Sequence, residues 1–218
     1  ALKQRGVTDL LLLPMFPHYA QATTESSLKH AHLQLKAMNW SPNLLEMGHF
    51  ETAEEFIGPL SESIRPHLTE DTHLLFSYHG LPVSHVKRID RSKAHCQTVE
   101  ACCTVKCEAN SLCYGRHCNE TTMAVVERLG LKPDQWSLSY QSRLGPVKWL
   151  EPSTTQMVEA LVKKGVKKLA IVAPAFLADG LETLEELDIG IREEFMEHGG
   201  TELKVINCLN DDEQWVRG

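Results

Sequence analysis

Short apolar runs alternate with stretches of helical periodicity along most of the chain. The apolar runs predict strands at residues 9–13, 74–78, 136–140, 168–173 and 203–206. Apolar residues that recur every three or four positions predict helices at residues 24–38, 53–64, 121–129, 154–164 and 181–198. Strands that alternate with helices favour an open α/β sheet with parallel strands, flanked by helices.

Several local expectations follow from the same pattern. The uninterrupted run at 9–13 is typical of a buried parallel strand. Thr23 or Thr24 is expected to cap the first helix. Gly58-Pro59 is expected to break the second helix or to delay its start. Residues 82–119 show no clear period, so no regular element is expected there.

The domain organisation is expected to change near residues 67–72. Residues 1–70 would be the end of an N-terminal domain, and residues 71–218 a C-terminal domain with a cysteine-rich insert at about 92–119. The first portion is too small to form a doubly wound domain alone. Ala1 is not an initiator and the tail stops without a natural cap, so we expect a fragment of a longer protein.

Composition and charge narrow the class of protein. The 218 residues are 42% hydrophobic and 23% charged, as in ordinary globular proteins. A net charge of −7 gives no basic surface for nucleic acid. No apolar run reaches the length of a membrane span, and no cleavable leader is visible. A cytoplasmic protein is therefore expected; peripheral membrane association and the oligomeric state stay open.

Chemically active side chains follow the predicted strands. In open α/β sheets, ligands bind beyond the carboxyl ends of the strands. The residues found there are Phe16, Tyr19, His79, Arg143, Trp149, Phe176, Asp179, Glu182 and Glu186. Aromatic, imidazole, guanidinium and carboxylate groups on one rim suit a flat, partly apolar ligand that carries acids and exchanges protons or a metal.

Each of these residues also has an ordinary structural explanation. His79 precedes Gly80, so its ring can stay exposed as a base or metal ligand, or else make a structural hydrogen bond. The acids at 179–186 share one helical face, although acids also favour helix N-termini. Arg143 could bind a substrate carboxylate or backbone carbonyls. The aromatic residues could line a pocket or belong to the core.

Four ordered segments carry a resemblance to a known family. They are Leu13–Tyr19 followed by Thr23-Thr24, Phe76–Pro82, Tyr140–Leu150 and Phe176–Asp188. In order and spacing they resemble the signature segments of the ferrochelatases, which insert ferrous iron into a porphyrin to make haem. The resemblance implies two similar Rossmann-like domains with the porphyrin between them, and here the first domain would be incomplete.

The resemblance also assigns roles to residues. It implies that His79 and Glu182 face the macrocycle centre and that His79 accepts pyrrole protons, binds iron, or both. Asp179 and Glu186 would continue an acidic path on a helix wound wider than an α-helix. Fe²⁺ and protoporphyrin or coproporphyrin would be the substrates. Gly180 replaces a frequent His or Cys of the family, which puts any role of that position in doubt.

A cysteine cluster follows the histidine segment. Its members are Cys96, Cys102, Cys103, Cys107, Cys113 and Cys118. Some ferrochelatases carry a [2Fe–2S] cluster, and four thiolates would hold one. Zinc is an alternative, weakened by the absence of a tight C-x2-C pair, and disulfides or free thiols are another. The sequence does not choose four ligands from six, and Cys208 is expected to be a buried structural thiol.

Two rival functions remain. One is a chelatase for another metal or tetrapyrrole, such as a cobaltochelatase. The other is a non-catalytic cysteine-based module that binds metal or transfers electrons on an α/β scaffold. A chelatase would require His79 and Glu182, whereas a cysteine-based module would keep its function without His79.

Overall fold

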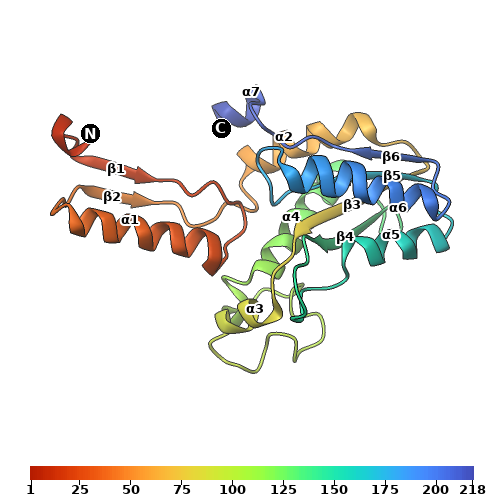
Figure 1. The fold of residues 1–218 in the computed structure, drawn as a ribbon, viewed down its shortest axis with the longest axis horizontal. Coiled ribbons are helices and arrows are strands. Elements are labelled where there is room, and N and C mark those ends of the chain that lie inside the picture. Colours follow the sequence, from red (N-terminus) through yellow and green to blue (C-terminus); the bar gives the residue numbers. More distant parts are fainter.

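The computed structural model describes residues 1–218 and has two visibly distinct parts. An arm at the N-terminus projects from a larger α/β body (Figure 1). The strands are β1 (Asp9–Leu12), β2 (Asn43–Glu46), β3 (Thr72–His79), β4 (Trp136–Gln141), β5 (Lys168–Val172) and β6 (Glu202–Val205). The α-helices are α1 (Ser26–Ala37), α2 (Glu54–Ile64), α3 (Val83–Ile89), α4 (Tyr114–Leu129), α5 (Thr154–Lys163), α6 (Arg192–Glu197) and α7 (Glu213–Arg217).

Five short segments have other helical windings. Two are π-helices, Gln21–Glu25 directly before α1 and Glu182–Ile191 directly before α6. Three are single 3-10 turns at Lys3–Arg5, Arg65–His67 and Glu108–Asn110. No helix of the chain is both long enough and apolar enough to cross a bilayer.

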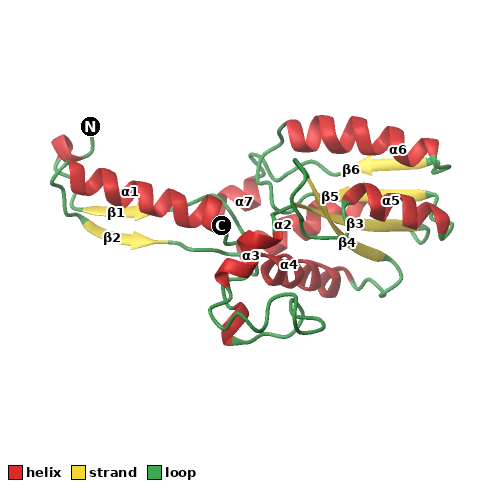
Figure 2. Cartoon of the chain, turned by 60° about the horizontal axis from the view of Figure 1, so that its bottom comes forward, coloured by secondary structure: helices red, strands yellow, loops and turns green.

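The body is built on a four-stranded sheet in the order β4-β3-β5-β6, with every neighbouring pair parallel. Successive side chains of a strand point to opposite faces of the sheet. Phe76 therefore joins the core under α2 and α4, whereas Leu75 joins a second core under α5 and α6 (Figure 2). Both faces of the sheet are covered, as parallel sheets require.

The register of the sheet brings the carboxyl ends of its central strands to one edge. His79 is the last residue of β3 and pairs with Gln141, the last residue of β4. The chain that leaves β5 starts at the same edge and leads through Phe176 to the π-helix Glu182–Ile191. The expected rim of chemically active residues is therefore formed in the body.

The expected break of the second helix is wrong. Helix α2 runs through Pro59 without interruption. The proline ring removes one backbone hydrogen bond, but Phe56, Ile57, Leu60 and Ile64 are all buried in the core beneath the sheet. Burying an aliphatic or aromatic side chain contributes about 1.5–3 kcal/mol each, so packing outweighs the local penalty.

The segment 82–119 is more regular than expected. Helix α3 occupies Val83–Ile89, and α4 begins at Tyr114 rather than near residue 121. Helix α3 buries only Val83 and Val86, which is too few apolar residues to show a period. The first turn of α4 contains glycine, arginine and histidine that are nevertheless buried, so hydropathy gives no signal for its start.

The arm also differs from expectation. Strand β1 pairs only with β2, which is too short to be recognised in the sequence, and Leu11 is 58% exposed. The expected burial of this strand is therefore not found. Thr23 and Thr24 do not cap a helix, because both lie inside the first π-helix, which starts after Ala20.

The expected domain boundary near residue 70 does not follow the packing. Helix α2 lies within the same hydrophobic core as β3 and α4. The elements that stand apart in Figure 1 are β1, α1 and β2, all of which precede residue 47. As a division of domains, 1–70 and 71–218 stays a prediction.

Candidate active site

A cavity of about 140 Å³ lies beyond the carboxyl ends of the strands. Three of the residues singled out in the sequence, Phe16, His79 and Phe176, line it together. Phe16 follows β1, His79 ends β3 and Phe176 follows β5, so segments far apart in the sequence meet here. The rings of His79 and Phe176 are 5.9 Å apart between centroids. The cavity thus combines apolar walls with an imidazole.

The tautomer of the neutral His79 ring is set by its neighbour. Its Nδ1 lies 2.6 Å from the backbone carbonyl oxygen of Gly80. A carbonyl can only accept, so Nδ1 carries the hydrogen and donates it. In the neutral ring, Nε2 therefore keeps a bare lone pair. Because the ring is only partly buried, this lone pair is available to take a proton or bind a metal.

Glu182 is attached to the same edge of the sheet through Gln141. The hydroxyl of Ser77 donates to Oε1 of Gln141 at 2.7 Å, and Nε2 of Gln141 donates to the backbone carbonyl of Glu182 at 2.8 Å. Gln141 is itself the register partner of His79. The side-chain carboxylate of Glu182 makes no hydrogen bond or ion pair within the chain, so it is free to meet a ligand.

The other two acids of the expected acidic path have partners. Both carboxylate oxygens of Glu186 accept hydrogen bonds from Ser142, one from the backbone N–H at 2.6 Å and one from the hydroxyl at 2.8 Å. Asp179 accepts from Asn210, Thr183 and the backbone N–H of Cys208. Burial acts to raise the pKa of Asp179, but these hydrogen bonds outweigh it and the pKa is lowered.

The loop after β4 places the remaining two rim residues differently. Trp149 packs over Gly80, where an added Cβ would lie 3.2 Å from the indole ring, and its Nε1 donates to the carbonyl of Leu144 at 3.0 Å. Arg143 is exposed and makes no ion pair within the chain. Trp149 therefore supports the turn after His79, and Arg143 is free to bind an acid of a ligand.

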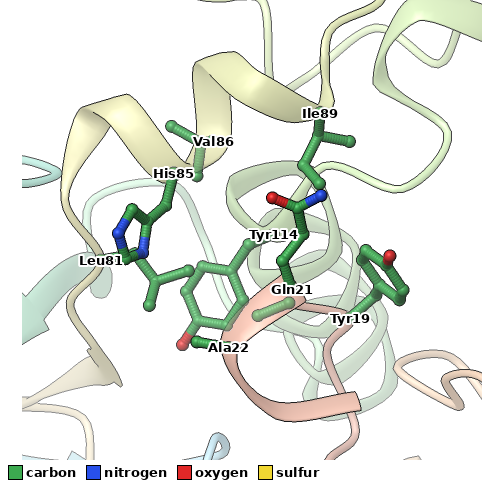
Figure 3. A pocket seen from close by; sticks show the side chains of 9 residues that line it. Tyr19, Gln21, Ala22, Leu81, His85, Val86, Ile89 and Tyr114 are labelled. Carbon is green, nitrogen blue, oxygen red and sulfur yellow. The ribbon is translucent and has the colours of Figure 1, made fainter. Parts of the chain in front are cut away.

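Tyr19 lies beside a neighbouring hollow rather than in the main cavity. This hollow lies between the first π-helix and α3, and Figure 3 shows Tyr19 at its edge, with Tyr114 and Leu81 inside. The Tyr19 hydroxyl donates to Glu25 at 2.8 Å. Burial, together with this hydrogen bond, raises the pKa of Tyr19 to about 12.

The sequence analysis missed a second histidine at the cavity. His18 lines it and is only 2% exposed. Burial lowers the pKa of His18 to about 3, with the nearby His117 as a further cause, so its imidazole is neutral at physiological pH. His18 stands in the quoted segment between Phe16 and Tyr19, but its burial depends on packing against Tyr78 and Tyr114, which the sequence does not show.

Behind His18 lies a trio of groups with metal-ligand chemistry, His49, Glu51 and His117, whose ligand atoms are within 4.8 Å of one another. The hydrogen bonds of His117 argue against a cation there. Its Nδ1 accepts the backbone N–H of Tyr19 at 3.2 Å, so its Nε2 is protonated and donates to the carbonyl of Ser111 at 3.0 Å. Neither nitrogen has a free lone pair.

The trio is therefore best described as a hydrogen-bonded network around a buried carboxylate. Nδ1 of His49 donates to Glu51 at 2.6 Å. Burial acts to raise the pKa of Glu51, but the hydrogen bond from His49 outweighs it, and the pKa is lowered to about 2. The same hydrogen bond raises the pKa of His49. The pair is thus an ion pair over a broad pH range.

The structure gives the six clustered cysteines different surroundings. Cys96, Cys102, Cys103 and Cys113 are close enough to perturb one another, and the sulfurs of Cys102 and Cys103 are 3.8 Å apart. The remaining two have other surroundings: Cys107 contacts the ring of His95, and Cys118, although near enough to Cys113 to be perturbed by it, is fully buried in the core. All seven cysteines of the chain are free thiols, and Cys208, which was expected to be buried, is only half-buried.

The two thiols of the Cys103–Cys113 pair differ in pKa. The hydrogen bond between the two thiols lowers the pKa of Cys113 and raises that of Cys103. Backbone N–H groups of Gly115 and Arg116, at the start of α4, add to the lowering. The thiolate form, which binds metals, is therefore favoured at Cys113.

Comparisons with known proteins identify the family of the chain. The Ferrochelatase family model matches residues 1–218. The ferrochelatase of Bdellovibrio bacteriovorus is 42% identical over 219 residues, which cover 100% of this chain and 64% of that protein. The ferrochelatase of Pseudomonas fluorescens is 40% identical over 214 residues, which cover 97% of this chain and 63% of that protein. The chain thus spans just under two thirds of the length of these relatives.

A solved structure is similar in fold. SirB from Bacillus subtilis, determined with Fe³⁺, superposes with a TM-score of 0.64 over 99% of this chain and 70% of that chain, at 10% sequence identity. This identity supports the fold alone. The parallel sheet flanked by helices, with a histidine at the end of β3 and a π-helix that carries Glu182, is compatible with the family match. Because the family model matches the whole length of the chain, the chain belongs to the ferrochelatase family.

Proposed function

We propose that the polypeptide containing this chain inserts Fe²⁺ into protoporphyrin or coproporphyrin to form haem, as a lyase of haem biosynthesis. The observation that carries the proposal is that His79, which lines an apolar cavity, is the strand partner of Gln141, whose side chain holds the backbone of Glu182. The family match supports the same reaction. Because the chain spans 64% of its relatives' length, the activity is proposed for the complete polypeptide.

His79 would take the pyrrole protons. A porphyrin binds a metal only after two N–H protons have left the ring. The Nδ1–H of His79 is held by the Gly80 carbonyl, so the bare lone pair of Nε2 is the acceptor at the cavity. A general base of this kind contributes about 10²–10⁴-fold to a rate. The ring then passes its proton to solvent and is ready for the second.

Glu182 would act opposite His79. Its backbone is held by Gln141, and its carboxylate makes no bond within the chain. A free carboxylate at this position attracts Fe²⁺, which is a substrate here, and favours loss of the water that surrounds it. In this proposal Glu186 and Asp179 serve mainly to hold the loop after β4 and the start of the π-helix.

The apolar walls would bind and bend the macrocycle. Phe16 and Phe176 offer flat faces to a flat ring, and the exposed Arg143 could pair with a propionate of the substrate. A planar porphyrin presents its lone pairs poorly to an incoming metal. Walls that fit a distorted ring better than a planar one would therefore accelerate insertion.

The test uses the complete polypeptide in an optical assay of iron insertion. His79→Ala and Glu182→Gln should each lower kcat by about 100-fold or more. Matched controls are His198→Ala and Glu185→Gln, which change exposed residues of the same type and should turn over like the parent. Unchanged turnover in both active-site variants would rule out the proposed mechanism, and a comparison of the two porphyrins identifies the substrate.

We also propose that the cysteine-rich insert holds a [2Fe–2S] cluster. Four thiols, those of Cys96, Cys102, Cys103 and Cys113, gather in the loop between α3 and α4, and the lowered pKa of Cys113 favours a thiolate. Four thiolates are the ligands that such a cluster requires. A bound cluster would cross-link this loop and supply a one-electron redox centre.

The cluster is tested independently of activity. Anaerobically purified protein should contain two iron atoms and two acid-labile sulfides per chain and should be coloured. Cys113→Ser should abolish the colour, whereas Cys107→Ser should keep it. A colourless, sulfide-free parent protein would refute the proposal, and loss of colour in Cys107→Ser would refute this choice of ligands.

The cytoplasm is the proposed location. All seven cysteines are free, and reducing compartments keep thiols in that state. Measuring the protein in separated cell fractions would test the location. The same fractions would show whether part of it is bound to the membrane periphery, and sizing the purified protein would give its oligomeric state.

A further inference from the structure

Tyr114, the first residue of α4, holds the backbone of the histidine at the candidate site. Its hydroxyl donates to the carbonyl oxygen of His79 at 2.7 Å. The bond is made where β3 ends, so it fixes the last peptide group of the strand. Tyr114 is 6% exposed and lines both the cavity beside His79 and the neighbouring hollow (Figure 3). Because a closely packed ring has little freedom, the hydroxyl keeps this carbonyl in one place.

This bond also affects the imidazole of His79. The carbonyl that Tyr114 holds belongs to the peptide group that joins His79 to Gly80. The carbonyl of Gly80, one peptide group further on, accepts the Nδ1–H of the His79 ring at 2.6 Å. A shift of the first carbonyl therefore turns the chain at Gly80. The second carbonyl then moves, and the ring that it holds moves with it.

Two thiols of the cysteine-rich insert lie against the same turn of α4. Cys113 directly precedes Tyr114 and is the N-cap residue of the helix. Its sulfur lies beside the backbone N–H groups of Gly115 and Arg116. Cys103 packs on the same turn, because a Cβ added to Gly115 would lie 3.0 Å from its sulfur, closer than side chains normally pack. This sulfur therefore rests directly on the helix backbone.

These contacts form a continuous path from the thiols to the imidazole. The path runs from the two sulfurs to the first turn of α4, then through the Tyr114 hydroxyl to the backbone of His79, and finally through Gly80 to the ring. Each step is a covalent bond, a hydrogen bond or a direct packing contact. Energetic coupling between two sites is carried by contacts of this kind.

We propose that Tyr114 is a positioning residue for His79, and that through it the thiols of Cys103 and Cys113 set the orientation of the His79 imidazole. A metal held by these thiols would constrain the first turn of α4, and the constraint would reach the cavity. The chemical use of the imidazole rests on the proposed function. The link itself does not, because it needs neither a porphyrin nor turnover.

The first measurement is the nuclear magnetic resonance signal of the His79 ring in the complete, porphyrin-free polypeptide, assigned by its loss in His79→Ala. Tyr114→Phe keeps the aromatic ring, removes only the hydroxyl and should shift the signal. Cys103→Ser and Cys113→Ser should also shift it, but neither should move it further in a protein that already carries Tyr114→Phe. Cys107→Ser, which changes another half-buried thiol of the same loop, should leave the signal in place.

Tyr78→Phe is the control that separates positioning from a general loss of packing. It makes the same chemical change at a fully buried tyrosine, whose hydroxyl lies 2.8 Å from that of Thr122. Both tyrosine variants should lose similar stability in urea unfolding. Only Tyr114→Phe should shift the His79 signal and lower kcat for iron insertion, by about 10-fold, with KM for porphyrin unchanged.

The outcomes distinguish this link from the proposed reaction. A parent-like His79 signal in Tyr114→Phe, or an equal shift in Tyr78→Phe, would overturn the positioning role. A parent-like signal in both Cys103→Ser and Cys113→Ser, or shifts that add to that of Tyr114→Phe, would overturn the role of the thiols. A polypeptide whose His79 signal responds as expected but which inserts no iron would refute the proposed function and leave the link intact.

Discussion

The side-chain amide of Gln141 donates a 2.8 Å hydrogen bond to the backbone carbonyl of Glu182. This bond joins the end of β4 to the first residue of the π-helix. Since Gln141 also pairs with His79 across the sheet, one residue sets where the imidazole and the carboxylate stand relative to each other. The geometry of the proposed reaction therefore depends on a residue that need not touch the substrate.

Replacing Gln141 tests this dependence. Gln141→Leu keeps the volume but removes the bonds to Ser77 and Glu182. We expect kcat/KM for iron insertion to fall about tenfold, which corresponds to about 1.4 kcal/mol. Urea unfolding should show a loss of about 1–3 kcal/mol from the unpaired groups. Gln135→Leu, just before the start of β4, is the control for activity, and an equal loss of activity there would contradict the argument.

Glu186 is expected to act through Ser142 rather than on the substrate. A double-mutant cycle with Glu186→Gln and Ser142→Ala should give an interaction energy of about 1 kcal/mol in urea unfolding, because Ser142→Ala removes the hydroxyl that donates to one carboxylate oxygen and keeps the backbone N–H that donates to the other. Either variant should change kcat far less than Glu182→Gln does. A loss of turnover in Glu186→Gln that equals that of Glu182→Gln would instead place Glu186 in the chemistry.

Gly80 is expected to tolerate no side chain. A Cβ there would lie 2.7 Å from the carbonyl oxygen of Gln141, which accepts the backbone N–H of Gly80. Gly80→Ala should lower stability by about 1–3 kcal/mol and should also impair iron insertion, because it displaces the strand ends. Gly48→Ala, which meets nothing within 4 Å, should leave both unchanged. Crystal structures of the two variants would locate the displacement.

Acid should destabilise the protein partly through His18. Burial lowers its pKa from 6.5 to about 3, so below pH 6.5 the unfolded chain binds a proton that the folded chain refuses. Stability is thus lost as pH falls from 6.5 toward 3. Between pH 6.5 and 5 the loss amounts to about 2 kcal/mol. His117, whose pKa burial also lowers, acts in the same direction, and His49 acts in the opposite one.

The check is urea unfolding at pH 7 and pH 5. Relative to the parent, His18→Phe should lose less stability on acidification, by about 2 kcal/mol. Glu51 does not confuse the comparison, because its pKa is about 2 and its unfolded value is near 4.5, so it acts mainly below this window. Identical pH dependence of the two proteins would show that His18 is not buried as described.

Much of the fold could be predicted because the strands of the body are buried on both faces. Leu74, Leu75 and Phe76 form an apolar run that only a covered strand explains. The π-helix was expected only from the family resemblance, since spacing alone fits an α-helix equally well. Strand β2 and helix α3 were missed because each buries too few apolar residues to show a period.

The candidate site likewise contains residues that the sequence predicts and residues that it does not. His79, Phe16 and Phe176 follow strand ends, and that position is readable in the sequence. His18 and Gln141 were not chosen, since their importance lies in what they bond to across the fold, Thr121 and Glu182. The four gathered cysteines differ from Cys107, which contacts His95, and from Cys118, which is buried in α4, and neither difference is visible in the sequence.

The wide winding of the π-helix Glu182–Ile191 sets the direction in which Glu186 points relative to Glu182. A π-helix accommodates more residues per turn than an α-helix and is seldom kept without a function. Deleting a single exposed residue between Glu182 and Glu186, such as Leu184, would allow the segment to relax to ordinary α-helical winding. The helix itself would gain regular hydrogen bonds, but every side chain after the deletion would rotate about the axis. Insertions and deletions here are therefore far less tolerable than substitutions.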